Sequence, residues 1–204
     1  MKHGFRTRPG PDTARLGSPA RPLLNLVVHL FYVLALVGCA SAPIEASWKQ
    51  QQTSALREQL IQLDKSVESD EAARLASTAV ETAAELAVEY RAVRPACLQN
   101  ILVNSGKRKR GLCYQWANDL YPHLYDLNLK TLELHLAVAR MDTRREHNSV
   151  VVTARSQPFE QGIALDAWRH SGRLCSHFVA KDKYPWKPLP RDRVAPELEK
   201  YMSQ

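Results

Sequence analysis

The spacing of apolar residues along the chain changes near Asp126, and this change limits the folds open to it. Residues 54–93 and 112–124 carry apolar side chains every three or four positions, which is typical of helices with one buried face. From residue 131 to residue 139, apolar side chains alternate with polar or small ones, as in a half-buried strand. Helices followed by strands indicate an α+β fold with an antiparallel sheet. A chain of 204 residues is long enough for one such domain.

The helical part is expected to contain a hairpin and a separate central helix. We predict a helical hairpin over residues 54–94, broken near Ser69. Pro95 ends this pattern. The α+β domain then covers residues 95–204, and its central helix is predicted over residues 112–124.

Three strands are expected after the central helix. The first covers residues 131–139, the second begins at His147 and continues through a run of valines, and the third covers residues 162–168. The Pro-rich segment 184–196 is predicted to be an extended strap over the domain, and residues 197–202 a short helix.

An apolar segment, residues 23–37, follows a basic leader. At about fifteen residues it is shorter than the roughly twenty that a helix needs to cross a bilayer, so we interpret residues 1–38 as a signal peptide. More than half of the formal net charge of +7 comes from the leader. Its charged residues are Lys2, Arg6, Arg8, Arg15, Arg21 and Asp12. The basic composition therefore reflects targeting, and nucleic acid is not an expected partner.

The segment Leu36-Val37-Gly38-Cys39-Ala40-Ser41 resembles the lipobox of bacterial lipoproteins. The resemblance implies that Cys39 is lipidated and that residues 39–53 form a tether to the membrane, which is then a partner through the lipid. Ala40 after the cysteine implies an outer-membrane location facing the periplasm. An ordinary cleaved signal peptide and an uncleaved anchor are the alternatives.

The cysteine count bears on the chemistry. With Cys39 lipidated, Cys97, Cys113 and Cys175 remain, and an odd number in an oxidising compartment leaves at least one free thiol. A disulfide between Cys97 and Cys175 would leave Cys113 free. The chain has no Cys-x-x-Cys or His-x-x-x-His pair that would supply clustered zinc ligands, so neither a metal nor a cofactor is expected.

Cys113, His147 and Asp166 are the candidate catalytic residues. Cys113 lies in the first turn of the central helix, after the basic run 107–110, and both features favour a thiolate. Asp166 lies among apolar residues and needs a partner if it is buried, which a hydrogen bond from His147 would provide. A carboxylate that orients an imidazole beside a thiol is the arrangement of nucleophilic catalysis.

Other roles remain open for these residue types. Cys113 is also compatible with a half-buried structural cysteine. His170 and His177 are alternative bases, whereas His135 is expected on the polar, exposed face of its strand.

Three segments resemble motifs of the transglutaminase-like superfamily, a branch of the papain-like fold, and most of all the bacterial transglutaminase-like cysteine proteinases. The segments are Gly111-Leu112-Cys113-Tyr114-Gln115-Trp116-Ala117, Glu146-His147-Asn148-Ser149-Val150-Val151-Val152 and Gly162-Ile163-Ala164-Leu165-Asp166-Ala167-Trp168. The resemblance spans residues 95–186 and implies that Cys113 attacks a carbonyl, His147 moves the proton and Asp166 orients His147. Ser149 departs from the pattern, because many members have an aromatic residue there. Backbone N–H groups at Cys113 are candidates for an oxyanion hole, with Gln99 or Gln115 as side-chain candidates.

Three functions are compatible with these observations. The first is thiol-dependent acyl transfer, most plausibly hydrolysis of an amide bond in a periplasmic protein or cell-wall peptide. The second is a catalytically inactive binding module of the same fold that recruits a protein or peptidoglycan partner. The third is an electrostatic surface module in which the basic run 107–110, with Tyr114 and Trp116, binds anionic polymer or lipid headgroups.

Overall fold

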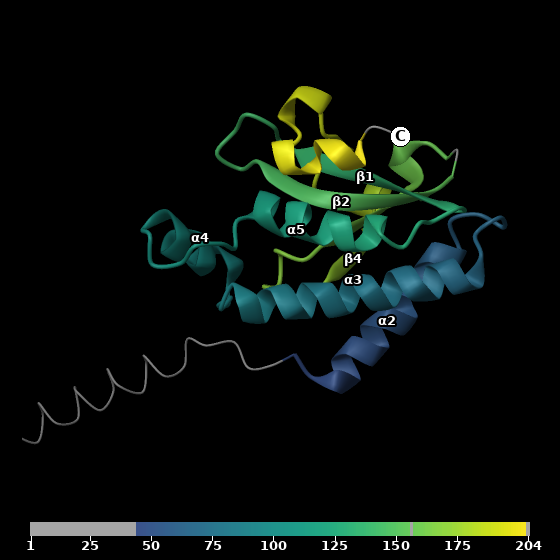
Figure 1. The fold of residues 1–204 in the computed structure, drawn as a ribbon, viewed down its shortest axis with the longest axis horizontal. Coiled ribbons are helices and arrows are strands. Elements are labelled where there is room, and N and C mark those ends of the chain that lie inside the picture. The colour runs from purple at the N-terminus through teal and green to yellow at the C-terminus, as the bar shows by residue number, and fades with distance from the viewer. Residues whose placement is uncertain (1–43, 156, 203–204) are drawn as a thin grey trace, which may run out of the picture. The chain divides into compact units, whose positions relative to one another are not determined.

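The structure is a computed structural model that describes residues 44–155 and 157–202 (Figure 1). The expected signal peptide and Cys39 lie outside the described residues. The described residues lie within one compact unit. No helix in the described part of the chain combines the length and the apolar character that crossing a membrane requires.

The elements follow the expected order of helices and then strands. The helices are α2 (Ala46–Ile61), α3 (Ser69–Glu89), α4 (Ala96–Asn104) and α5 (Cys113–Tyr125). The strands are β1 (Leu132–Ala139), β2 (His147–Ala154), β3 (Ile163–Asp166), β4 (Cys175–Phe178) and β5 (Trp186–Pro188). Short 3-10 helices cover Phe159–Gln161, Val179–Lys181, Arg191–Arg193 and Pro196–Tyr201. This order confirms the predicted α+β class.

The five strands form one antiparallel sheet in the order β4-β3-β2-β1-β5. β1 and β2 pair along their whole length, from Leu132 opposite Ala154 to Ala139 opposite His147. β2 lies in the centre and all of its residues are buried. The short strands β4 and β5 form the two edges.

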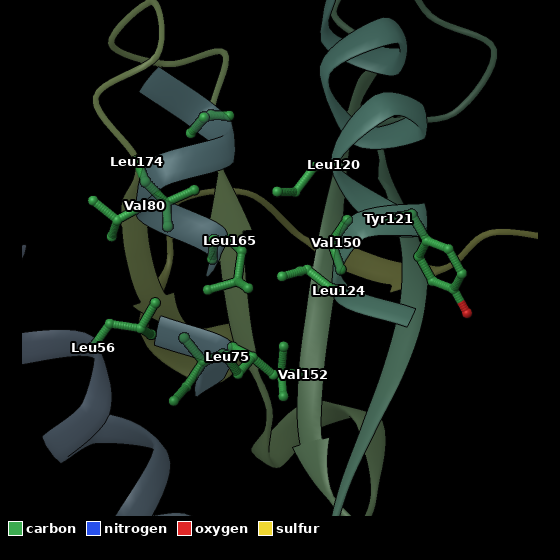
Figure 2. Packing of buried hydrophobic residues seen from close by; sticks show 14 of the residues in the cluster. Leu56, Leu75, Val80, Leu120, Tyr121, Leu124, Val150, Val152, Leu165 and Leu174 are labelled. Carbon is green, nitrogen blue, oxygen red and sulfur yellow. The ribbon is translucent and has the colours of Figure 1, made fainter. Parts of the chain in front are cut away.

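The main core lies between the helices and one face of the sheet. α5 packs against β1 and β2 on one side and against α3 on the other, and α2 packs on α3 (Figure 1). Figure 2 shows leucine and valine side chains from α3, α5, β2 and β3 meeting in this core. The amphipathic pattern of α5 follows from this position, because Leu120 and Leu124 face the sheet and are fully buried.

A smaller core lies on the opposite face of the sheet. Alternate residues of β2 and β3, Val151 and Ala164, point into it, as does Trp186 of β5. His147 and Asp166 have the same parity along their strands as Val151 and Ala164, so they project from this second face. The strand pattern therefore decides which side of the sheet holds the candidate residues.

Several boundaries differ from the predictions. α2 begins at Ala46, so much of the segment expected to be a tether is helical, because Leu56 and Leu60 at helical spacing pack against α3. α4 was not expected, since it buries only Ala96 and Gln99 and leaves Ile101 exposed.

The two edge strands were also missed by the prediction. β4 has four residues and β5 three, too few to show an alternating pattern. β5 lies in the predicted strap and ends at Pro188, which an edge strand tolerates. The third predicted strand is shorter than expected, Ile163–Asp166.

Candidate functional site

Cys113 is the first residue of α5, and several contacts hold this helix start in place. The Oε1 atom of Gln115 accepts hydrogen bonds from the backbone N–H groups of Gly111 (2.8 Å) and Leu112 (3.0 Å). The indole Nε1 of Trp116 donates to the carbonyl oxygen of Gly111 at 3.0 Å. Gly111 has φ +129 and packs so closely on Gln99 that an added Cβ would lie 2.6 Å from that side chain. The position of Cys113 is thus set by the packing that precedes it.

The thiol of Cys113 lies against the start of β2. Its Sγ atom is 3.8 Å from the carbonyl oxygen of Glu146 and 3.8 Å from Oδ1 of Asn148. His147 lies between these two residues in sequence, and the Cys113 side chain contributes to raising the pKa of His147. The fold therefore brings together a residue from a helix start and a residue from a strand start.

His147 and Asp166 form the hydrogen bond that the sequence analysis expected. The Nε2 atom of His147 lies 2.7 Å from Oδ2 of Asp166, and the two side chains are 3% and 2% exposed. The antiparallel pairing of β2 with β3 makes this contact possible, because it places both side chains on the same face of the sheet. Because Nε2 faces Asp166, the Nδ1 atom is the ring nitrogen left for Cys113.

The surroundings favour a charged His147. Burial by itself lowers the pKa of His147, but hydrogen bonds to Asp166 and Cys113, and attraction to both, raise it to about 9. Burial has the opposite effect on Asp166 and by itself would raise the pKa of this carboxyl group. Its hydrogen bond with His147 and the charges of His147 and Arg169 outweigh burial and lower the pKa. These surroundings therefore favour the protonated form of His147 beside the Asp166 carboxylate once the ring has accepted a proton.

Arg169 and Asp182, which the sequence analysis did not single out, continue this row of charges. The Nε atom of Arg169 lies 3.0 Å from Oδ2 of Asp166, and its backbone N–H donates to Oδ1 at 3.0 Å. The guanidinium also forms two hydrogen bonds to the Asp182 carboxylate, at 2.8 and 3.3 Å. The indole Nε1 of Trp186 donates to Asp182 at 2.9 Å. No sequence pattern marks these residues, since their contacts join separate loops.

Three aromatic rings surround His147. Its ring centroid lies 4.5 Å from that of Tyr184, 4.8 Å from that of Trp168 and 5.2 Å from that of Trp186. Ser149, where many members of the superfamily have an aromatic residue, instead donates a hydrogen bond to the carbonyl oxygen of Leu165 at 2.8 Å. The aromatic wall beside His147 therefore comes largely from the C-terminal strap. The aromatic residues within the Pro-rich segment were the one signal that could have indicated it.

A cavity of about 590 Å³ is lined in part by two of these rings, Trp168 and Tyr184. Trp168 and Tyr184 line it together with the Arg169–Asp182 ion pair and with Lys181 and Lys183, and these two lysines make its net charge positive. The cavity thus has a cationic lining beside the candidate site.

The side-chain candidates for an oxyanion hole have structural roles. Gln99 is buried, its Oε1 accepts the backbone N–H of Val93 at 3.1 Å, and its Nε2 donates to the carbonyl oxygen of Arg110 at 2.9 Å. The Oε1 of Gln115 caps the start of α5, as described above. Both ends of the Gln99 amide are thus occupied, which argues against that residue, whereas Gln115 is engaged through Oε1 and stays a candidate together with the backbone N–H groups at the start of α5.

The other candidate histidines and cysteines lie elsewhere. His135 is half-buried, not on the surface as expected, and its Nε2 is 3.0 Å from Oγ1 of Thr153. His170 and His177 are exposed, and it is His147 that holds the hydrogen bond to Asp166. Cys97 and Cys175 are both free thiols, so the structure does not contain a disulfide between them.

The basic run 107–110 offers less than its sequence suggested. Trp116 is buried and bonded to Gly111, so it is not available to a ligand. Arg110 forms an ion pair with Asp119 of α5. The run therefore serves in part to hold the loop onto the helix that carries Cys113.

Among the described residues, no group of three or more histidine, cysteine, aspartate or glutamate side chains is placed to hold a metal ion. Scans against models of known protein families, and searches of curated proteins and of solved structures, found no match. The site is thus argued from its own geometry.

Proposed function

We propose that the protein is a thiol-dependent acyl-transfer enzyme that hydrolyses an amide bond, with Cys113 as nucleophile, His147 as acid and base, and Asp166 as the residue that orients His147. The observation that carries the proposal is the buried His147–Asp166 pair beside the thiol at the start of α5. The resemblance of the three segments to the transglutaminase-like superfamily, and with it a papain-like fold, belongs to the same proposal.

The chemistry follows the triad logic of covalent catalysis. The Cys113 thiol gives its proton to Nδ1 of His147, and the thiolate attacks the amide carbonyl carbon, so a C–S bond forms. When the tetrahedral intermediate collapses, the C–N bond breaks and the proton on His147 passes to the leaving amine. Water then attacks the thioester and gives a proton to His147, the C–S bond breaks, and a carboxylic acid is released.

The start of α5 supplies groups for the oxyanion. The backbone N–H groups of Cys113 and Tyr114 belong to the first turn of the helix, where no preceding helical carbonyl accepts them. A negative oxygen formed next to Sγ would lie at the positive end of the helix dipole.

The substrate is proposed to be a periplasmic protein or a cell-wall peptide. The cationic cavity beside the aromatic wall suits a substrate with carboxylate groups near the bond that is cleaved. The location follows from the lipobox resemblance of Cys39, which supports a lipid anchor at the outer membrane facing the periplasm.

A second candidate function is a binding module of the same fold without catalysis. It is favoured by the burial of His147, which is 3% exposed under Trp168, Tyr184 and Trp186. A leaving amine needs access to the imidazole, whereas a binding groove does not.

Alkylation of Cys113 distinguishes the two functions. The test uses the full chain with Cys39→Ser, Cys97→Ser and Cys175→Ser, in which Cys113 is the remaining cysteine. We expect iodoacetamide to react rapidly with Cys113 at pH 7, and His147→Ala to slow that reaction by roughly tenfold or more, because the imidazolium no longer stabilises the thiolate.

His135→Ala is the matched control, since it removes a half-buried histidine of β1 that contacts Thr153. It should leave the alkylation rate unchanged. Equal rates in the parent chain and the His147→Ala variant would contradict the catalytic proposal and direct attention to partners of a binding module.

A further inference from the structure

We infer that Arg169 is a positioning residue of the thiol site and that Asp182 is its counter-ion, so that the pair sets how strongly Asp166 holds His147. The inference rests on the proposed thiol chemistry. It concerns residues outside the three segments on which the triad was predicted.

A single carboxylate oxygen is shared between two cationic groups. Oδ2 of Asp166 lies 2.7 Å from Nε2 of His147 and 3.0 Å from Nε of Arg169. Oδ1 accepts the backbone N–H of Arg169 at 3.0 Å. The carboxylate is thereby held by both oxygens, and a shift of Arg169 would change the hydrogen bond that His147 receives.

The charge of Asp182 determines whether Arg169 weakens the hydrogen bond between His147 and Asp166. An unpaired guanidinium beside Asp166 would repel the His147 imidazolium and weaken its attraction to the carboxylate. Asp182 neutralises Arg169 through two hydrogen bonds, and the two side chains are 1% and 11% exposed, respectively. Charges therefore alternate along the row His147, Asp166, Arg169 and Asp182, in surroundings where solvent screens them little.

The same carboxylate holds the strap over His147. Oδ2 of Asp182 accepts the indole N–H of Trp186 at 2.9 Å, and the Arg169 guanidinium carbon lies 4.9 Å from the ring centroid of Tyr184. Both rings lie against His147. The Arg169–Asp182 pair thus links the charge of the triad to the rings that exclude water from it.

Few other titratable groups surround His147. Among the described residues they are Cys113 of α5, Asp166 of β3 and Tyr184 of the strap, with Arg140 and Lys183 over the Tyr184 ring at 5.2 and 5.4 Å. Arg140 forms no ion pair with a described residue. It therefore provides a control cation that contacts the same aromatic ring but not the carboxylates.

The test measures the titration of His147 by NMR of its ring signals, together with the pH dependence of Cys113 alkylation, in the full chain with Cys113 as the remaining cysteine. Asp182→Asn keeps the size of the side chain and an acceptor for Trp186 but removes the charge. We expect it to lower the pKa of His147 by roughly one unit and to slow alkylation at pH 7 by roughly tenfold.

Three further variants complete the design: Arg169→Lys, Arg140→Gln and Asp166→Asn. Arg169→Lys keeps the charge but cannot bond Asp166 and both oxygens of Asp182 together, so we expect alkylation at pH 7 to fall by roughly threefold or more. Arg140→Gln should leave both measurements as in the parent chain. Circular dichroism of each variant establishes that it is folded before its rates are compared.

The outcomes separate this inference from the proposed function. If Asp166→Asn slows alkylation while Asp182→Asn and Arg169→Lys match the parent chain in both measurements, the positioning role is wrong and the triad stands. If Asp166→Asn has no effect either, the thiol chemistry itself is wrong. If Arg140→Gln shifts His147 as much as Asp182→Asn does, the effect reflects general charge near the strap and the inference is overturned.

Discussion

Among single residues, Asp166 has the most demanding surroundings. It is 2% exposed and receives hydrogen bonds from His147 and Arg169, so it is both a buried charge and the point where two cations meet. A carboxylate at this depth is tolerated only because its partners are in place. The Asp182 carboxylate is held in the same way, because it accepts hydrogen bonds from Arg169 and Trp186.

This arrangement predicts how Asp182→Asn changes stability with pH. Burial raises the pKa of Asp182, but hydrogen bonds from Arg169 and Trp186 outweigh it and lower that pKa below its ordinary 3.8. Between the lowered and the ordinary pKa, the unfolded chain binds more protons than the folded one. The stability that Asp182 contributes is therefore complete above about pH 4 and is lost as the pH falls further.

We therefore expect the parent chain to be more stable than Asp182→Asn at pH 6, and the difference to narrow at pH 3. Urea unfolding at both pH values measures the difference in the free energy of unfolding. Asp192→Asn, at an exposed position of a 3-10 helix, is the control and should cost little at either pH. A difference that stays the same from pH 6 to pH 3 would contradict the prediction.

At the scale of elements, one carboxylate ties the helical pair to the sheet. Glu71, in the first turn of α3, is 3% exposed and accepts hydrogen bonds from the backbone N–H groups of Lys130 and Thr131 and from the Thr131 hydroxyl. These groups immediately precede β1. Thr131 and Glu71 are 60 residues apart in the sequence. Their contact fixes the start of α3 against the segment that leads into β1.

Glu71→Ala should therefore destabilise the fold by about 3 kcal/mol, because it leaves backbone N–H groups without their acceptor. Glu71→Gln keeps one oxygen acceptor and should cost less. The free energy of unfolding in urea measures both effects. Glu85→Ala, an exposed position of the same helix, is the matched control, and an equal loss in Glu85→Ala and Glu71→Ala would show that removing any carboxylate from α3, and not breaking this contact, is responsible.

At the scale of the whole molecule, the candidate site lies where four distant parts of the chain meet. The start of α5, the start of β2, the end of β3 and the strap each contribute one or more side chains. The central position of β2 gives the site a rigid base, while the strap covers it from the edge of the sheet.

The proposed membrane attachment has its own test. In a bacterial host that processes lipoproteins, the full chain should incorporate an alkyne analogue of palmitate and sediment with the membranes, and Cys39→Ala should do neither. Cys97→Ser, which removes an exposed thiol of the folded domain, is the control and should be labelled as the parent chain is. Labelling that survives Cys39→Ala would refute the lipobox interpretation.

The sequence by itself determined the central helix, the two long strands and the pairing of His147 with Asp166. Periodicity located α5 and β1 to within one or two residues, because each has one long face that must be buried, and the run of valines located the fully buried β2. The hydrogen bond between His147 and Asp166 was also predictable, because a carboxylate among apolar residues needs a partner and neighbouring antiparallel strands bring such side chains together.

Only the tertiary structure decided what surrounds that pair. β4 and β5 are too short to show a period, and α4 buries too few residues to show a face. The aromatic rings over His147 and the Arg169–Asp182 pair come from loops and edges whose positions depend on docking against the finished sheet. Such contacts join residues with no regular spacing, so the sequence contains the partners but no local signal that pairs them.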